Sequence, residues 1–261
     1  MIRALYTSAS GMQAQQMNLD VISNNLANVN TTGYKKNKIE FQDLLYQTQR
    51  PAGAQQGQGA VTPTAIQVGH GARVGSTARV FSAGELTKTG EKLDVAINGD
   101  GFFEVQLPDG TRGYSRDGAL KLDSQGRFVT SEGYQILSGF QAVPQGTTEI
   151  TFANNGDVTM RNANGSQTNF SVQLVRFPNS GGLESVGGNI YKETPASGQA
   201  TPGIPGQDGL GTMQQGFLEM SNVKVVEEMV NMIVAQRAYE VNSKAVQASD
   251  DMMQQANNLR R

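Results

Sequence analysis

Residues 221–259 read SNVKVVEEMVNMIVAQRAYEVNSKAVQASDDMMQQANNL. Apolar and small side chains recur there every three or four residues, and this spacing places them on one face of an α-helix. Ser221 is positioned to cap the helix, and Glu227 and Glu228 follow near the positive end of the helix dipole. We therefore predict one long amphipathic helix from Asn222 to Leu259. Its main apolar positions are Val223, Val226, Val230, Val234, Val241, Ala245, Ala248, Met252 and Leu259.

The opposite end of the chain, residues 1–34, carries a second helical pattern. Its main apolar positions are Ile2, Leu5, Met12, Leu19, Ile22, Leu26 and Val29. The polar face is unusual because Arg3 and Asp20 are the only charged residues in this segment, whereas a helix that faces water usually carries interspersed Lys and Glu. Neutral polar side chains enter a contact without the desolvation cost of an ion. Both faces of this helix can therefore be buried.

Two helices so far apart in the sequence can pair in two ways. They form a helical hairpin that closes the chain on itself, or they pack against other copies of the chain. Periodicity alone fits both arrangements. The nearly uncharged N-terminal helix favours assembly, so the apolar positions of the two helices are the predicted polymer interface.

Between the helices the pattern changes to that of β-structure. Residues 46–82 are rich in Gln, Gly, Ala, Pro and Thr, a composition that fits either a flexible linker or an extended arm with a role of its own. From residue 93 to about residue 191, turn pairs such as Asp109-Gly110 recur between short apolar runs, as consecutive antiparallel strands require. We predict an all-β barrel or sandwich there, with a loop-rich return over residues 181–216.

Composition excludes several classes of protein. Hydrophobic residues make up 37% of the chain and 31 residues are Gly, which predicts one modest β core with extended parts. The net charge of −2 and the lack of a dense basic run argue against nucleic-acid binding. No apolar run of about 18 residues is present to insert into a membrane. Polar residues near the N-terminus interrupt any cleavable signal peptide, and the absence of Cys excludes disulfides and thiolate metal sites.

No group of residues forms a convincing catalytic, cofactor-binding or metal site. His70 is the only histidine, and it lies between two glycines, which favours a turn residue over a catalytic base. The aspartates that could act as paired carboxylates lie at or near glycine turns, where Asp accepts hydrogen bonds from its own backbone. They are Asp100, Asp109, Asp117, Asp123 and Asp157. We therefore predict no enzyme activity, no cofactor and no metal.

Three ordered motifs resemble the axial rod and hook proteins of the bacterial flagellum. They are ISNNLANVNTTGY at residues 22–34, LDVAINGDGFF at residues 93–103 with YSRDG at 114–118 and GRFVT at 126–130, and GFLEMSNV at 216–223 with EMVNMIVAQRAYE at 228–240. The family-motif positions that we single out as candidate site residues are Asn24, Asn25, Leu26, Asn28, Thr32, Gly33, Tyr34, Gln236, Arg237, Tyr239 and Glu240. The length near 260 residues and the long segment after Tyr46 are most similar to the distal-rod branch of the family.

The resemblance implies a structural subunit that self-assembles helically into a rigid hollow drive shaft, which transmits torque from motor to hook. It implies a homopolymer with proximal-rod and hook axial proteins as neighbours and the P- and L-ring proteins around it. It also implies export through the flagellar type III apparatus without signal cleavage, and a place in the basal body where the rod crosses the periplasm toward the outer membrane. A hook or proximal-rod subunit is the first alternative. A cell-wall glycan-binding or hydrolytic β module is the second.

These expectations combine into an α+β fold with four parts. Residues 1–45 hold the N-terminal helix and signature segment of an inner core, and residues 46–82 form an extended Gly/Gln/Pro-rich arm. Residues 83–215 form a β-rich outer domain with its loop-rich return, and residues 216–261 supply the C-terminal helix of the core. The terminal helices of many subunits are expected to form a coiled-coil-like inner tube.

Overall fold

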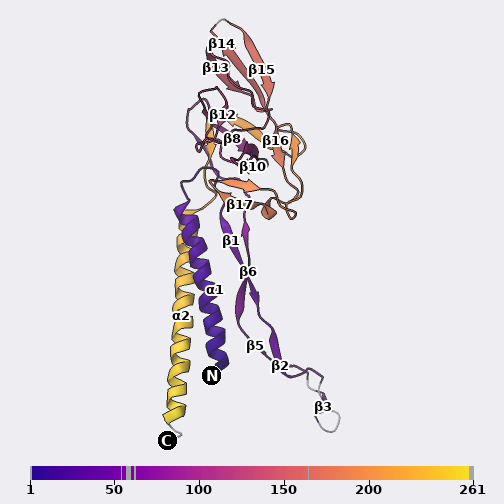
Figure 1. Ribbon diagram of the computed structural model, residues 1–261. Helices are drawn as coiled ribbons and strands as arrows, with labels where there is room; N and C mark the ends of the chain where they lie inside the picture. Colours follow the sequence, from indigo (N-terminus) through magenta and orange to yellow (C-terminus); the bar gives the residue numbers. More distant parts are fainter. Residues whose placement is uncertain (1, 54, 57–59, 62, 164, 259–261) are drawn as a thin grey trace. The chain divides into compact units, whose positions relative to one another are not determined.

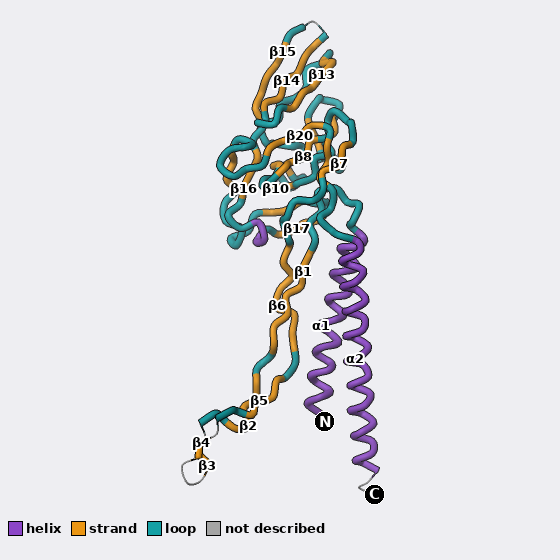
Figure 2. Tube along the Cα trace, turned by 180° about the vertical axis from the view of Figure 1, so that it is seen from behind, coloured by secondary structure: helices purple, strands orange, loops and turns teal. Residues whose placement is uncertain are grey.

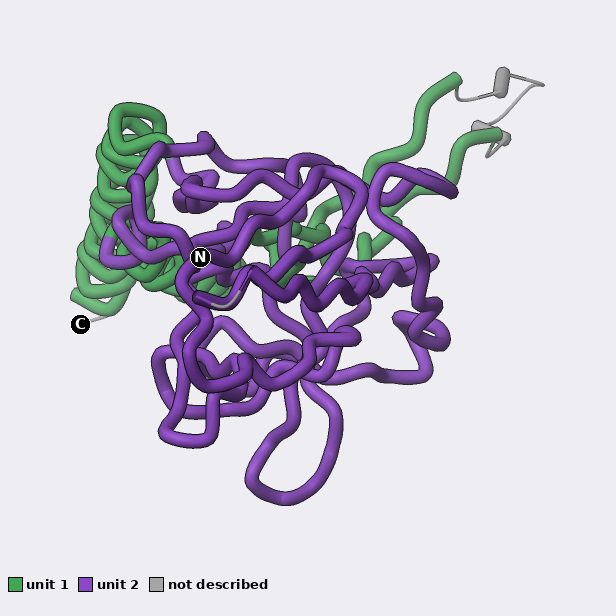
Figure 3. Tube along the Cα trace, turned by 90° about the horizontal axis from the view of Figure 1, so that it is seen from above, with its two compact units in different colours: residues 1–26, 37–78, 224–261 green, residues 27–36, 79–223 purple. Residues whose placement is uncertain are grey.

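The computed structural model describes residues 2–53, 55–56, 60–61, 63–163 and 165–258. The chain divides into two compact units, which Figure 3 colours separately. The first unit holds Met1–Leu26, Asn37–Ala78 and Lys224–Arg261, and the second holds Ala27–Lys36 and Arg79–Val223. Long helices in the first unit and short strands in both give the chain the predicted α+β class.

The two helices of the first unit, α1 (Ile2–Ala27) and α2 (Val225–Asn258), lie side by side (Figure 1). They contact each other at Gly11, where an added Cβ atom would lie 2.9 Å from Nδ2 of the Asn242 side chain. A larger residue at position 11 would therefore require the Asn242 side chain to shift. Across the described residues, neither helix is long and apolar enough to cross a membrane.

The N-terminal helix is shorter than its sequence pattern predicted. It ends at Ala27, because the following residues fold into turns. The Thr31 amide donates a hydrogen bond to the Asn28 carbonyl, and Gly33 adopts a positive φ of 67°. Asn, Thr and Gly favour such turns over helix because their side chains compete for backbone groups or because glycine tolerates a positive φ.

The C-terminal helix begins later than predicted, at Val225 and not at Asn222. Asn222 is held by the backbone of the second unit, since its Oδ1 accepts a hydrogen bond from the Lys36 amide. The Ser221 hydroxyl accepts one from the Val223 amide, so the prediction that Ser221 caps the helix was wrong. These side-chain bonds keep residues 221–223 out of the helix.

The described residues between Asn37 and Arg79 pair as the two sides of a long hairpin (Figure 2). The pairs are β1 (Asn37–Asp43) with β6 (Ala72–Arg79), β2 (Tyr46–Arg50) with β5 (Ile66–Gly69), and β3 (Gln55–Gln56) with β4 (Ala60–Val61). His70 and Gly71 lie between β5 and β6, and Gly71 has a φ of 109°, so the strand is interrupted at these two residues, and His70 itself is not part of a turn. Composition alone left a flexible linker and an extended arm open, and the structure pairs much of this segment into strands.

The second unit consists of short strands in several small sheets. The largest has the order β17 (Glu184–Gly187), β18 (Ile190–Lys192), β10 (Arg112–Ser115), β9 (Phe103–Gln106). A three-stranded sheet holds β13 (Thr147–Phe152), β14 (Asp157–Asn162) and β15 (Gln167–Ser171). The remaining pairs are β7 (Leu86–Lys88) with β21 (Phe217–Glu219), β8 (Val95–Asn98) with β20 (Thr212–Gln215), β11 (Lys121–Leu122) with β12 (Phe128–Val129), and β16 (Leu174–Arg176) with β19 (Thr201–Gly203). A short 3₁₀ turn, η1, spans Ser180–Gly182.

Within the described residues these sheets form neither the single barrel nor the two-sheet sandwich that the turn spacing predicted. Strands such as β11, with two residues, are too short to extend a continuous sheet. Glycines with positive φ, such as Gly126 at 76°, reverse the chain directly after them. The return predicted to be loop-rich contributes strands β17 to β20.

One hydrophobic core fills the centre of the second unit. Val95 and Ile97 from β8, Phe103 and Val105 from β9, and Met213 from β20 are each at most 1% exposed. Residues near the start and the end of this unit's sequence therefore share one core. An adjoining aromatic cluster includes edge-to-face contacts, which are a favourable ring geometry.

Candidate interaction surfaces

Helix α2 has two faces of different character. Ala235, Asn242 and Ser249 are spaced seven residues apart, so they share one face, and the contact of Asn242 with Gly11 directs that face toward α1. Ala235 and Ser249 are buried. These three residues on the face of α2 that meets α1 are therefore small or polar.

Large apolar side chains occupy a different face of α2. Val230 lies about 140° around the helix from Ala235, at about 100° per residue. Val226 and Val241 are 75% and 65% exposed. We call this surface the apolar strip, and it consists of Val226, Val230, Ile233, Val234, Val241 and Met252. The chain alone leaves the strip in contact with solvent.

The predicted interface positions are distributed unevenly over these surfaces. Ile22 is buried, Leu5, Met12, Leu19, Leu26 and Val29 are half-buried, Ala245 and Ala248 are exposed, and Val223 is buried in the second unit. The side chain of Ile2 and all of Leu259 lie outside the described residues. Their role in a polymer stays a prediction.

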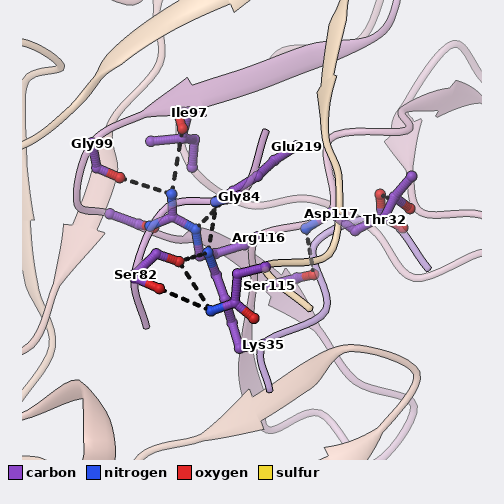
Figure 4. A network of polar contacts seen from close by, with 12 residues as sticks. Thr32, Lys35, Ser82, Gly84, Ile97, Gly99, Ser115, Arg116, Asp117 and Glu219 are labelled. Atoms are coloured by element: carbon purple, nitrogen blue, oxygen red, sulfur yellow. Dashed lines mark hydrogen bonds and ion pairs between the residues drawn. The ribbon is translucent and has the colours of Figure 1, made fainter. Parts of the chain in front are cut away.

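A cluster of three charged side chains is buried in the second unit (Figure 4). Oε1 of Glu219 accepts a hydrogen bond from Nζ of Lys35 at 2.6 Å, and Oε2 accepts one from Nε of Arg116 at 2.8 Å. Each of these side chains is at most 2% exposed. We call them the Glu219 cluster. Glu219 is 184 positions from Lys35 and 103 from Arg116, so the cluster joins distant parts of the chain.

Backbone groups complete the hydrogen bonding of this cluster. Nζ of Lys35 also donates to the Ser82 carbonyl, and Oε1 of Glu219 accepts from the Gly84 amide. The Arg116 guanidinium donates to the carbonyls of Ile97, Gly99 and Gly101. These three side chains carry one excess positive charge, and the Asp100 carboxylate acts on Lys35 from outside the cluster. Removing the Glu219 carboxylate would leave both cations without their ion-pair partner in a buried site.

The pKa values of the cluster reflect burial and mutual charge. Burial lowers the pKa of the Lys35 amine and the Arg116 charge lowers it further, while Glu219 acts in the opposite direction. Burial by itself raises the pKa of the Glu219 carboxyl, but the charges of Arg116 and Lys35 outweigh it and hold that pKa below its usual value. Glu219 is therefore ionised at neutral pH.

Asn25 in the N-terminal motif fixes the end of α1 within the first unit. Its buried side chain exchanges two hydrogen bonds with the Asn37 backbone, each 2.9 Å long. An amide side chain can replace a strand partner in this way because it carries both a donor and an acceptor. The neighbouring motif residue Asn24 is exposed, and Leu26 is half-buried.

The next motif residues belong to the second unit. The Thr32 hydroxyl donates to Oδ1 of Asp117 at 2.9 Å. A Cβ atom on Gly33 would lie 2.8 Å from the Asp117 nitrogen, and the φ of 67° is itself strained for other residues, so this position requires glycine. Tyr34 is buried, with the Arg79 guanidinium 5.9 Å from its ring centre.

The aspartates proposed as paired carboxylates mostly serve turns. Oδ1 of Asp109 accepts hydrogen bonds from the hydroxyl and the amide of Thr111, which lower the pKa of Asp109 to about 2. Oδ1 of Asp123 accepts from the amides of Gln125 and Arg127. Asp117 differs, because burial raises the pKa of its carboxyl. In the part of the chain that the structure describes, no three His, Asp or Glu side chains are grouped to hold a metal ion.

Comparison with known proteins gives three matches in the order of the motifs. The family model "Flagella basal body rod protein" matches residues 5–35, "Flagellar hook protein FlgE/F/G D1 domain" matches 96–160, and "Flagellar basal body rod FlgEFG protein C-terminal" matches 214–259. A Borreliella burgdorferi protein named "Flagellar basal-body rod protein FlgG" is 49% identical over 100% of both chains. The chain belongs to the FlgG family of flagellar basal-body rod proteins.

Other FlgG proteins match over a similar extent. The Caulobacter vibrioides protein of this name is 45% identical over 99% of this chain and 100% of its own length. The Bacillus subtilis protein is 40% identical over 100% of both. The Glu219 cluster takes one residue from each of the three regions that the flagellar family models match, namely Lys35, Arg116 and Glu219.

The C-terminal motif positions of this FlgG-family chain lie on the surface of α2. Gln236, Arg237 and Glu240 are exposed, and Tyr239 is 39% exposed. Arg237 donates to Oε2 of Glu240 at 2.8 Å, a pair one helical turn apart. Such exposed pairs add little stability, and the importance of these family-motif positions stays a prediction.

Sequence reasoning did not select the residues of the Glu219 cluster as functional. One signal was present, because Arg116 and Glu219 are charged residues inside the motifs at residues 114–118 and 216–223. A buried charge requires a partner of opposite sign. The sequence did not show which cations pair with Glu219, because Arg116, the nearer of the two, is 103 positions away.

Proposed function

We propose that this chain is a structural, non-enzymatic subunit of the flagellar distal rod, which polymerises helically into a rigid hollow drive shaft that transmits torque from motor to hook. Rod proteins named FlgG match the whole chain, which supports this function over a hook or proximal-rod subunit. One observation carries the proposed mechanism. The apolar strip of α2 lies on a different face from the one that pairs with α1.

The apolar strip is the surface that neighbouring copies should cover. Burying apolar area contributes about 25 cal/mol per Å² and offsets the entropy lost on ordering. The strip and the outer side of α1 are different surfaces of one chain, so a contact between them on two copies is heterologous and repeats from copy to copy. Such a contact produces a helical filament with the terminal helices inside.

Residues 46–82 are proposed as the extended arm that neighbouring subunits grip. Paired strands make this segment stiffer than an unstructured linker. Near its base, Leu45 is 89% exposed and Tyr46 is 56% exposed, and Phe41 and Ile66 are each 44% exposed. Apolar side chains so placed favour contact with another copy, which would restrict sliding and keep the shaft straight.

The partners follow from the family resemblance. The rod would join proximal-rod axial proteins on one side and hook axial proteins on the other, inside the P- and L-ring proteins. The subunit would reach that place through the flagellar type III export apparatus without signal cleavage. Its location would be the basal body, where the rod crosses the periplasm toward the outer membrane.

Electron microscopy at high protein concentration tests the proposal. The intact chain should form tubes, whereas a chain without residues 2–24 should not, because it lacks most of α1. The truncated chain retains Ala27–Lys36, so its second unit should keep the thermal unfolding transition of the intact chain. Tubes from the truncated chain would overturn the proposal. So would an intact chain that stays monomeric with both helices ordered.

A further inference from the structure

The second unit pairs its first strands with its last. Strand β7 pairs with β21, and β8 pairs with β20, both antiparallel. Within the described residues neither β7 nor β8 pairs with any other strand. The edges that β20 and β21 cover therefore stay open until residues 212–219 are available, whereas the first residue of β8 has a second contact, because the Val95 amide donates to the Gly118 carbonyl. By contrast, β9 with β10 and the sheet of β13, β14 and β15 pair strands that are close in sequence.

Backbone hydrogen bonds next to these strands also join the first and last parts of the unit's sequence. The Gly216 amide donates to the Asp94 carbonyl, and the Met220 amide donates to the Glu85 carbonyl. The Gly33 amide donates to the Glu219 carbonyl. Residues 212–220, which we call the closing segment, thus bind the start of the unit along their whole length.

The Glu219 cluster also depends on the closing segment, because Glu219 belongs to that segment. Lys35 and Arg116 are buried in the finished unit, and Glu219 is the carboxylate that pairs with both. Without the closing segment, these two buried cations would lose the carboxylate that forms ion pairs with both, which is strongly unfavourable, although the Asp100 charge also acts on Lys35. Met213 on β20 is also fully buried in the hydrophobic core, so the core is incompletely packed until the closing segment docks.

We infer that the closing segment completes the second unit last and that Glu219 is the ionic latch of that step. Local hairpins form without large loop closure, whereas docking residues 212–220 must close a loop of more than a hundred residues. A chain that emerges from its N-terminus, at a ribosome or from a channel, keeps its β-rich unit open until nearly all of it has emerged. This inference concerns folding of the single chain and does not depend on rod assembly.

Pulse-labelling hydrogen exchange during refolding of the full chain tests the order. Amides of β14 and β15 should become protected in an early phase. Amides of β7 and β8 should become protected later, in the same phase as those of β20 and β21. Protection of β8 before β20, or together with β14 in a single phase, would overturn the inference.

Charge variants test the latch. In Glu219→Gln, equilibrium protection of the β7 and β8 amides should fall at least tenfold, while the early phase at β14 is unchanged. The double variant Lys35→Met/Glu219→Gln restores the wild-type count of one excess positive charge, so it should recover protection relative to Glu219→Gln. Glu184→Gln, at an exposed position, is the control. Equal protection in Glu219→Gln and Glu184→Gln, or no recovery in the double variant, would contradict the latch.

Discussion

Glu219 is the residue on which the stability of the second unit should depend most. Replacing it with Gln keeps the shape of the side chain but leaves Lys35 and Arg116 buried without their ion-pair partner. Loss of one partner of a buried pair costs about 3–5 kcal/mol. We therefore expect Glu219→Gln to lower the free energy of unfolding by about that amount in urea denaturation, with Glu184→Gln within about 0.5 kcal/mol of wild type. A loss below about 1 kcal/mol would contradict the buried ion pairs.

Acid should weaken the same contact. The pKa of Glu219 lies below its reference value of 4.5 in the folded chain, so below pH 4.5 the unfolded chain binds the proton more readily. The stabilisation by Glu219 is therefore present above pH 4.5 and is lost as pH falls through the folded pKa. The gap in unfolding free energy between wild type and Glu219→Gln should shrink from about pH 7 to about pH 3. If the difference in unfolding free energy between wild type and Glu219→Gln does not change with pH, the ionised Glu219 carboxylate does not stabilise the fold.

At the scale of elements, one face of α2 contacts α1 of the same chain, and the apolar strip on another face is predicted to contact other copies. Val230 and Val234 are 53% and 63% exposed, so replacing both with Gln should change monomer stability by about 0.5 kcal/mol or less. Each Val contributes about 1.5–3 kcal/mol when buried, and about 1.4 kcal/mol corresponds to a factor of ten in an equilibrium constant. The double variant should therefore raise the critical concentration for polymerisation at least about tenfold.

A sedimentation assay measures that concentration, with Gln247→Asn as the control because Gln247 is an exposed polar residue outside the strip. If the Val230→Gln/Val234→Gln chain pellets like wild type, the apolar strip is not the polymer interface.

At the scale of the whole molecule, the arm can be shortened without damage to the folded units. Arg50 pairs with Ile66 at the end of β2 and β5, so an Asn-Gly turn replacing residues 51–65 should close the hairpin there. Removing all of residues 46–82 would also remove Ser82, whose carbonyl binds Lys35. The shortened chain should still form tubes, but softer or bent ones. Micrographs give the persistence length, and an unchanged straight, stiff tube would count against the arm.

Local features of the fold were predictable because they depend on neighbouring residues. The three- and four-residue spacing of apolar side chains indicated both helices, and Gly33 and Asn28 show why α1 ends where it does. Turn pairs such as Asp109-Gly110 were recognisable for the same reason. The way that short strands combine into small sheets was not predictable, since strand pairing depends on partners elsewhere in the chain.

The amino-acid sequence was sufficient to establish the flagellar family, the terminal helices and the turns, because periodicity, turn chemistry and motif order are properties of contiguous residues. Folding was needed to reveal which face of α2 meets α1, and that Lys35, Arg116 and Glu219 share one buried site. The physical reason is distance along the chain. Glu219 is 103 positions from Arg116 and 184 positions from Lys35. Contacts over such separations depend on how the whole intervening chain folds, and no local sequence pattern encodes them.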